Sequence, residues 1–333
     1  MKAPAVSVVM TVFNGGTFLR PAIDSILGQT WADWELVVVD DGSTDGSREV
    51  LESFASADPR IRIFLNSTNV GQTPCLNQAI REARGKWIAR QDADDLSLPH
   101  RIEAQVRAAE RDGLVLVGTN GWIISERGAF AGLLNAPLSD SGIRWGLLLL
   151  NPFIHTSVLF LREAGGGVVQ YDERFRICQD WDLWARCSRF GPVANLPGRL
   201  VCYRFRENSL SHQASERTRE ECQAIVESVW GHAFPDVPLL PGEAAVLERF
   251  REGLEPGDVP GFRQLLARMK WLWLGSGKPS PDPQAEAVHW FHAGGSLARK
   301  SKPAALAATL RTFAADPAWA ARAVLDRVRG IPN

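Results

Sequence analysis

Residues 6–45 read VSVVMTVFNGGTFLRPAIDSILGQTWADWELVVVDDGSTD, and this stretch decides the fold. The first seven residues, Val6–Val12, are almost all apolar, which is typical of a strand buried on both faces of a sheet. Residues 18–27 place their apolar side chains on one face of a helix, and residues 35–41 repeat the buried-strand pattern. A strand, a helix and a second strand in succession predict a right-handed crossover and a parallel sheet.

The alternation of strands and helices continues to residue 119 and weakens beyond Pro137. The fold class that it predicts is α/β, with a mostly parallel, Rossmann-like sheet that carries helices on both faces. From residue 215 onward the sequence is helical in pattern and rich in Ala and Arg. We therefore expect two domains, over 1–214 and over 215–333, the second being a helical C-terminal extension. The other predicted helices are 43–57, 73–83, one near Pro99, 143–150 and one in 178–187; the other strands are 61–65, 86–91, 115–119, 156–161 and 200–205.

The composition is that of an ordinary globular protein, with 45% hydrophobic and 23% charged residues among 333. A net charge of −1 gives no electrostatic bias toward nucleic acid, so we expect no nucleic-acid partner. The five cysteines form no closely spaced pair, which indicates reduced thiols in a cytoplasmic protein. The apolar runs are too short or too interrupted to predict a signal peptide or a membrane span.

Polar clusters follow three of the predicted strands, at residues 11–14, 40–45 and 92–95. The carboxyl ends of parallel strands meet at one edge of a sheet, and α/β proteins bind their ligands there. Asp92, Asp94 and Asp95 bring three carboxylates into four residues, where they repel one another unless a cation is bound. Oxygen ligands of this kind suit Mg²⁺ or Mn²⁺ bridging to phosphates. The alternative is a solvated loop whose acids cap the helix near Pro99.

Two common nucleotide-binding sequences are missing from the chain. It contains neither the dinucleotide fingerprint G-x-G-x-x-G nor the phosphate loop G-x-x-x-x-G-K-[ST]. Their absence disfavours a dehydrogenase and a P-loop nucleotidase.

Several segments taken together resemble glycosyltransferase family 2. They are residues 6–47, NVGQTPCLNQAI (69–80), GKWIARQDADDLSLPHR (85–101), NPFIHTSVLFLRE (151–163) and QDWDLWARCSRFG (179–191). The resemblance covers roughly residues 4–212. It implies the GT-A fold and transfer of a sugar from a nucleotide donor with inversion at the anomeric carbon.

The resemblance also implies roles for individual residues on the donor side of the site. Thr11 and Phe13, with Asn14 beside them, would line the base pocket, and Asp41 would bind the base, with a UDP-sugar favoured as donor. Asp94 would bind Mn²⁺ or Mg²⁺, and Asp92 would lie near the metal and the ribose or donor sugar. The other candidates for contacts with the donor diphosphate, all of which have surface or structural alternatives, are His155, Arg204 and His212.

The general base is assigned to Asp180 by the same resemblance. The chemistry agrees, because inversion in one displacement needs a base that removes the acceptor hydroxyl proton during the attack. Asp182 is the local competitor, since it lies two residues away on another side of the same predicted helix. The alternative, in which Asp180 caps a helix over Trp181–Arg189, is compatible with this role.

The chain departs from the family pattern at two places. Gln179 stands where an acid usually precedes the base, and no arginine occurs in 74–77, where many relatives have one for a base contact. Arg90 and Arg101 are the candidates to replace that arginine.

The partners predicted from the sequence are a nucleotide sugar and a saccharide or lipid-linked acceptor, in assembly of a bacterial surface polysaccharide or glycolipid. Residues 259–333 hold eleven Lys and Arg against four Asp and Glu, with tryptophans among them. This basic region favours either peripheral contact with the inner face of the membrane or a helical cap and homo-oligomer contact. Two rival functions are a catalytically silent scaffold that binds nucleotide sugars and a sugar nucleotidyltransferase, although FNGGTF lacks the basic glycine-rich loop of the latter.

Overall fold

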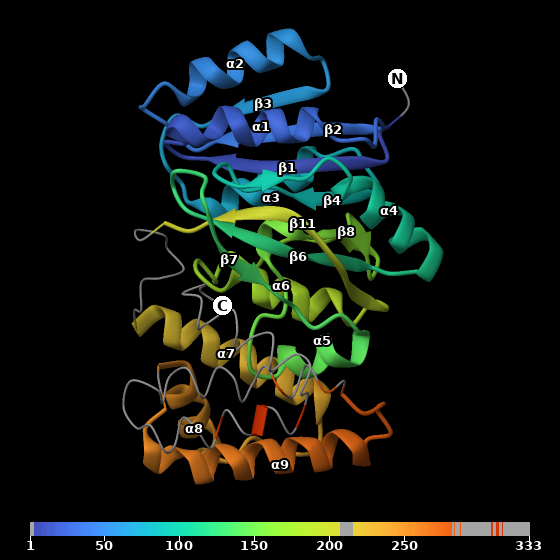
Figure 1. Ribbon diagram of the computed structural model, residues 1–333, viewed down its shortest axis with the longest axis vertical. Coiled ribbons are helices and arrows are strands. Elements are labelled where there is room, and N and C mark those ends of the chain that lie inside the picture. The colour runs from blue at the N-terminus through green and yellow to red at the C-terminus, as the bar shows by residue number, and fades with distance from the viewer. Residues whose placement is uncertain are drawn as a thin grey trace. The chain divides into compact units, whose positions relative to one another are not determined.

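The computed structural model describes residues 3–206, 216–252 and 254–281, and single residues at 283, 287, 308, 311, 312 and 315 (Figure 1). The described residues group into two compact units. The first unit holds the residues up to 136 and from 153 to 206, and the second holds 137–152 with the described residues from 216 on. The domains expected from the sequence, 1–214 and 215–333, had placed 137–152 with the first part of the chain.

A single nine-stranded sheet forms the centre of the first unit, with strands in the order β3-β2-β1-β4-β8-β6-β11-β5 and with β7 paired to β6. A separate two-stranded hairpin joins β9 and β10. The strands are β1 (Val6–Val12), β2 (Trp34–Asp40), β3 (Ile61–Leu65), β4 (Trp87–Arg90), β5 (Leu96–Ser97), β6 (Leu116–Ile124), β7 (Phe130–Leu134), β8 (Leu159–Leu161), β9 (Glu163–Ala164), β10 (Gly167–Val168) and β11 (Val193–Arg204).

Helices connect these strands and make up most of the described second unit (Figure 1). Those of the first unit are η1 (Gly16–Phe18), α1 (Leu19–Leu27), α2 (Ser47–Ala57), α3 (Gln72–Glu82), α4 (Arg101–Asp112), η2 (His155–Ser157) and α6 (Gln179–Cys187). Those of the second unit are α5 (Asp140–Leu147), α7 (Glu216–Ala233), α8 (Pro241–Glu252), η4 (Pro256–Asp258) and α9 (Val259–Gly275).

The half of the sheet built from β3, β2, β1 and β4 is entirely parallel, as the alternating pattern predicts. Every residue of β2 is buried, and the interior residues of β1 are fully covered, which explains their continuous apolar sequences. The other half is mixed, because β8 runs antiparallel to both β4 and β6 while β11 runs parallel to β6.

The parallel half brings the three polar clusters to one edge. Val12 lies beside Asp40 in the register of β1 and β2, and Val9 lies beside Arg90 in the register of β1 and β4. The residues that follow these strands therefore leave the same edge of the sheet. This confirms the packing that the carboxyl-end argument requires.

Helix α2 begins at Ser47, four residues later than the sequence predicts. Two residues at the predicted start, Ser43 and Asp45, bond to other parts of the chain, and Asp45 also accepts the N–H of Ser47 at 3.1 Å. Ser43 and Asp45 accept hydrogen bonds from backbone N–H groups of the turn after β1, at 2.9 and 2.8 Å. Long-range bonding thus displaces the helix start from the position that local propensity favours.

Within the described residues, every helix falls short of the length or the apolar character needed to cross a lipid bilayer.

Candidate functional site

Asn14 ties the loop after β1 to the loop after β2. Its backbone has φ of +53°, a left-handed conformation that asparagine tolerates better than most residues. Its Oδ1 accepts from the N–H of Thr44 at 2.9 Å, and its own N–H donates to Oγ of Ser43 at 2.9 Å. Asn14 therefore shapes this rim, and the neighbouring Phe13 side chain, 53% exposed, faces solvent where a ligand could pack on it.

Asp41 is buried at the end of β2 and organises the loop before α3. Its Oδ1 accepts from the N–H of Val70 at 2.8 Å and from the amide of Asn66 at 3.2 Å, and its Oδ2 accepts from the N–H of Gly71 at 2.8 Å. A carboxylate accepts about four hydrogen bonds, so these three leave room for the predicted base contact. The loop-holding role was not predicted from the sequence, because its partners lie 25 to 30 residues away.

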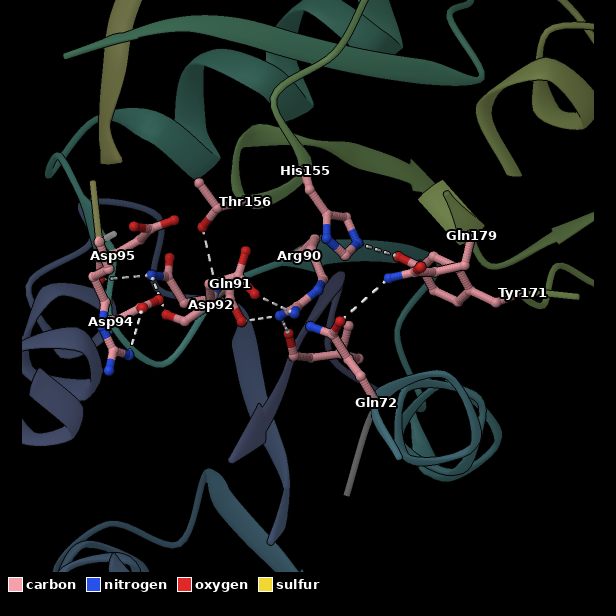
Figure 2. Close-up of polar contacts among 12 residues, drawn as sticks. Gln72, Arg90, Gln91, Asp92, Asp94, Asp95, His155, Thr156, Tyr171 and Gln179 are labelled. Atoms are coloured by element: carbon pink, nitrogen blue, oxygen red, sulfur yellow. Dashed lines mark hydrogen bonds and ion pairs between the residues drawn. The ribbon is translucent and has the colours of Figure 1, made fainter. Parts of the chain in front are cut away.

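The acidic turn at 92–95 is held in shape by Gln91, which is fully buried. Its Nε2 donates to the carbonyl oxygens of Asp92 and Asp95, at 3.0 and 2.9 Å. Its Oε1 accepts from Oγ of Ser97 at 2.6 Å and from the guanidinium of Arg101 at 3.2 Å. Nε2 thus fixes the backbone that carries the carboxylates, while Oε1 is held by two neighbouring side chains (Figure 2).

The three carboxylates of the turn have different surroundings. Asp92 forms an ion pair with the fully buried Arg90, and Asp94 lies 3.3 Å from the guanidinium of Arg206. Asp95 is buried, and its Oδ1 accepts from the N–H of Arg204 at 2.6 Å. Burial and the charge of Asp92 raise the pKa of Asp94, and the same two causes, with Asp94 added, raise the pKa of Asp95 well above its usual range.

The donor atoms of this turn fit a divalent cation that is shared with a ligand. Among the described residues, no group of three or more His, Cys, Asp or Glu side chains is arranged to hold a metal by itself. Asp92 and Asp94 are both partly exposed and repel each other. Mg²⁺ and Mn²⁺ are commonly held by one or two carboxylates together with substrate phosphates, and this pair matches that donor set.

Arg204, predicted as a diphosphate contact, is occupied by the backbone near the acidic turn. Its Nε donates to the carbonyl oxygen of Asp94 at 2.7 Å, and its Nη1 donates to the carbonyl oxygens of Ser125 and Glu126 at 3.0 and 3.2 Å. His212, the other candidate named with it, lies outside the described residues.

Arg206 reaches the carboxylate of Asp94 and was not identified from the sequence. Its guanidinium lies over the ring of Phe18, 5.3 Å from the centroid, and its side chain is 41% exposed. The signal was present, because residues two apart in an extended segment share a face and Arg206 follows Arg204 at that spacing.

Arg90 and Arg101 do not offer a guanidinium to a nucleobase, because both side chains are fully buried. Arg101 donates to the carbonyl oxygens of Arg90 and Val158, at 2.7 and 3.1 Å. Burial, with the charge of Arg90 nearby, lowers the pKa of Arg101 to about 9. These two residues form the support below the acidic turn.

His155, which is partly exposed, and the buried Tyr171 form a pair beside Arg90 (Figure 2). Nε2 of His155 lies 2.9 Å from the hydroxyl of Tyr171. Burial, with the charge of Arg90, lowers the pKa of His155 well below its usual range, so the ring is neutral near pH 7. A donor contact by His155, as predicted, would therefore be made by a neutral imidazole.

Asp180 and Asp182 both lie in the first turn of α6 and differ in their partners. Asp182 forms an ion pair with Arg186 at 2.7 Å, four residues along the helix. Asp180 accepts the N–H of Trp181 at 2.8 Å through one oxygen and is partly exposed. The ion pair neutralises Asp182, which weighs against this residue as the base.

Tyr171 places the acidic turn and Asp180 in one electrostatic neighbourhood. Burial raises the pKa of its hydroxyl, Arg90 opposes that shift, and the charges of Asp180 and Asp92 both add to it. Asp92 and Asp180 therefore act on the same buried hydroxyl from separate segments of the chain. Asp41 is connected to this region by two hydrogen bonds. It accepts the N–H of Gly71, and the next residue, Gln72, accepts a hydrogen bond from Gln179, which precedes Asp180.

The depressed pKa of His155 predicts a loss of stability in mild acid. The unfolded chain binds a proton below a pKa of about 6.5, whereas the folded protein does not. Because of this difference, the contribution of His155 to the free energy of unfolding should fall by about 1 kcal/mol between pH 6.5 and 5.5. Urea unfolding at both pH values should show this loss in the wild type and not in His155→Gln. Replacing the exposed His100 by Gln is the control, and equal pH dependence in wild type and His155→Gln would contradict the prediction.

Comparison with known proteins gives consistent matches over the first part of the chain. The profile of glycosyl transferase family 2 matches residues 7–164. EpsE of Bacillus subtilis is 35% identical over 211 residues, which cover 62% of this chain and 74% of EpsE. The O-antigen biosynthesis glycosyltransferase WbnJ of Escherichia coli is 31% identical over 214 residues, covering 63% of this chain and 83% of WbnJ.

Solved structures match over most of the chain at low identity. TarS 1–349 of S. aureus, in complex with UDP-GlcNAc, has a TM-score of 0.58 and 13% identity, covering 92% of this chain and 89% of TarS. The mannosyltransferase PcManGT of Pyrobaculum calidifontis, in complex with GDP-Man and Mn²⁺, has a TM-score of 0.55 and 18% identity, covering 98% and 88%. These likenesses concern the fold, and they confirm the GT-A class expected from the sequence.

Proposed function

This chain belongs to glycosyltransferase family 2, and from that membership we propose that it moves a sugar from a nucleotide donor to an acceptor hydroxyl with inversion. The observation that carries the proposal is one cluster of contacts: Asp92 pairs with Arg90 beside His155 and Tyr171, and Gln179, the residue before Asp180, bonds to Gln72 in the same region (Figure 2). A cation-binding pair and a base that share one region are what a single displacement requires.

In the proposed reaction Asp180 takes the proton of the acceptor hydroxyl while that oxygen attacks the anomeric carbon. The new C–O bond forms on the face opposite the diphosphate, the bond to the diphosphate oxygen breaks, and a nucleoside diphosphate leaves. Asp94 and Asp92 would hold Mn²⁺ or Mg²⁺, whose charge stabilises the leaving diphosphate when it is bound. Gln91 holds the carbonyl oxygens of Asp92 and Asp95 at the two ends of the turn, and Arg206 supplies a further positive charge next to Asp94.

The donor is proposed to be a UDP-sugar bound at the edge formed by β1 and β2. Phe13 offers an exposed ring for stacking, Thr11 is partly exposed at the end of β1, Asn14 shapes the rim, and Asp41 would bind the base. The complexes of TarS with UDP-GlcNAc and of PcManGT with GDP-Man and Mn²⁺ support a nucleotide-sugar donor and a divalent cation. The acceptor is proposed to be a saccharide or glycolipid of a bacterial surface polysaccharide, as the name of WbnJ suggests.

Thermal unfolding with UDP-, GDP- and dTDP-sugars, each with Mn²⁺, tests the donor, because a ligand that binds the folded state raises the melting temperature. Release of the nucleoside diphosphate, measured with and without sugar acceptors, then tests transfer. We expect stabilisation by at least one donor and turnover that depends on an acceptor. Binding without turnover across all donors and acceptors would instead support the silent scaffold, and formation of a nucleotide sugar from a sugar phosphate would support the nucleotidyltransferase.

Helix α9 of the second unit is proposed to contact an anionic membrane surface on the inner, cytoplasmic side. Trp271 is 73% exposed and Leu274 47% exposed on this helix, which contains three basic residues and no acidic one. Exposed tryptophan and leucine next to basic residues are typical of interfacial helices, and anionic lipid attracts the basic groups.

Sedimentation with vesicles containing anionic lipid tests this contact. The protein should sediment with these vesicles and much less with neutral ones, and Trp271→Ala should lower the bound fraction several-fold because the indole supplies much of the buried apolar area. Phe190→Ala, at an exposed ring of the first unit, is the control. Equal binding by wild type and Trp271→Ala would contradict the proposed membrane contact. It would favour the alternative, in which this region is a helical cap or a homo-oligomer contact.

A further inference from the structure

The first turn of α3 is anchored to the end of β2 by Asp41. Gly71, the residue before the helix, has φ of +100° and offers no side chain to cap it. The carboxylate of Asp41 accepts the N–H groups of Val70 and Gly71, both at 2.8 Å, and so holds the two residues that lead into the helix. A negative charge at a helix N-terminus is also favoured by the helix dipole. Any ligand that binds at Asp41 is therefore one residue away from the start of α3.

The same helix holds the segment that leads to Asp180. Asn77 brackets Tyr171, since its Oδ1 accepts the N–H of Tyr171 at 2.8 Å and its Nδ2 donates to the carbonyl oxygen at 3.0 Å. Thr73 donates to the carbonyl oxygen of Phe175 at 3.0 Å. Both side chains are buried, so these bonds fix the segment against α3.

The last of these links is made by two glutamines. Nε2 of Gln179 donates to Oε1 of Gln72 at 3.2 Å (Figure 2). Gln72 is the first residue of α3, and Gln179 is the first residue of α6 and precedes Asp180. Gln179 is 4% exposed, and its Oε1 is buried without a hydrogen-bond partner among the described residues. A buried amide with one unmet end costs about 1–3 kcal/mol, so packing alone gives no reason for a glutamine at this position.

We propose that Gln72 and Gln179 form a positioning bridge that fixes the orientation of Asp180 relative to the donor site. The proposal rests on the function proposed above, since it needs Asp180 to be the base and Asp41 to lie in the donor site. Through the bridge, the loop that Asp41 holds for the nucleotide also sets the start of α6. Gln72 and Gln179 touch neither reacting atom; they act through the carboxylate that follows them.

The bridge can be broken without unfolding the protein. Gln72→Leu and Gln179→Leu keep side chains of similar size and remove the hydrogen bond, and the second also removes the unmet acceptor, so its melting temperature should not fall. We expect each variant to lower kcat about tenfold, because small displacements of a catalytic group are costly, while KM for the donor stays within about twofold. The double variant should be no slower than the slower single variant, since both remove one bond.

Two matched variants separate positioning from general damage to α3. Gln72→Glu keeps an acceptor for Nε2 of Gln179, so kcat should stay within about threefold of wild type. Gln78→Leu, at another half-buried glutamine of the same helix, should leave kcat unchanged. An active wild type whose two bridge variants keep full kcat would overturn the bridge alone, as would losses that multiply in the double variant. A wild type without turnover on any donor would instead remove the proposed function, and the bridge with it.

Discussion

Asp180→Asn is expected to lower kcat for sugar transfer by about 10²–10⁴, the range that a general base contributes, with donor binding unchanged. The amide keeps an oxygen that can accept the N–H of Trp181, so the start of α6 should be preserved. What the amide lacks is the basicity needed to take the acceptor proton. Single-turnover transfer and a nucleotide-dependent thermal shift, measured on the same preparation, separate the two effects.

Asp182→Asn is the matched control for this experiment. It lies two residues away in the same helix turn, and its charge is already neutralised by Arg186. Loss of this ion pair should cost stability of about 0.5 kcal/mol and leave kcat within about threefold of wild type. The assignment of the base fails if Asp182→Asn is as slow as Asp180→Asn, or if Asp180→Asn stays within tenfold of wild type.

Asp94→Ala is expected to remove the stabilisation that a nucleotide sugar gives in the presence of Mn²⁺. A ligand present at a hundred times its Kd stabilises the folded protein by about 2.7 kcal/mol, which corresponds to a shift in melting temperature of about 4 °C in a protein of this size. Asp94 is the carboxylate of the turn that is both partly exposed and not paired with a buried arginine. The loss should appear as a melting curve that no longer responds to Mn²⁺ and nucleotide together.

Asp95→Asn tests whether the effect belongs to Asp94 or to negative charge in general. Asp95 is buried, unlike the partly exposed Asp94, and the amide keeps the size of the carboxylate while removing its charge. Its Oδ1 could still accept from the N–H of Arg204. We therefore expect Asp95→Asn to keep the Mn²⁺-dependent shift. An unchanged shift in Asp94→Ala would exclude this residue as a cation ligand.

The parallel half of the sheet could be predicted from the sequence because each strand carries its own signal. Buried runs such as Val6–Val12 and the apolar faces of the helices between them are local patterns. The mixed half could not be predicted in this way. Nothing in Leu159–Leu161 indicates that this strand lies antiparallel between β4 and β6, since pairing depends on segments more than forty residues away.

The candidate carboxylates were accessible to sequence reasoning, whereas the residues that hold them were not. Asp92, Asp94 and Asp180 stand in recognisable segments, but the bond from Arg101 to Val158 joins residues 57 apart and that from Gln72 to Gln179 joins residues 107 apart. Arg204 illustrates the same limit, because its position suggested a ligand contact and its actual partners are backbone carbonyls.

The two buried arginines below the acidic turn affect the stability of the protein when no cation is bound. Arg90 and Arg101 are fixed charges that cannot leave, so a large part of the turn's negative charge is balanced from within before any cation arrives. A fold that carries its own counterions does not depend on a dissociable one for its integrity. In the proposed reaction, a cation would then arrive with each donor and depart with each product, and we expect a chelator to stop transfer without unfolding the protein.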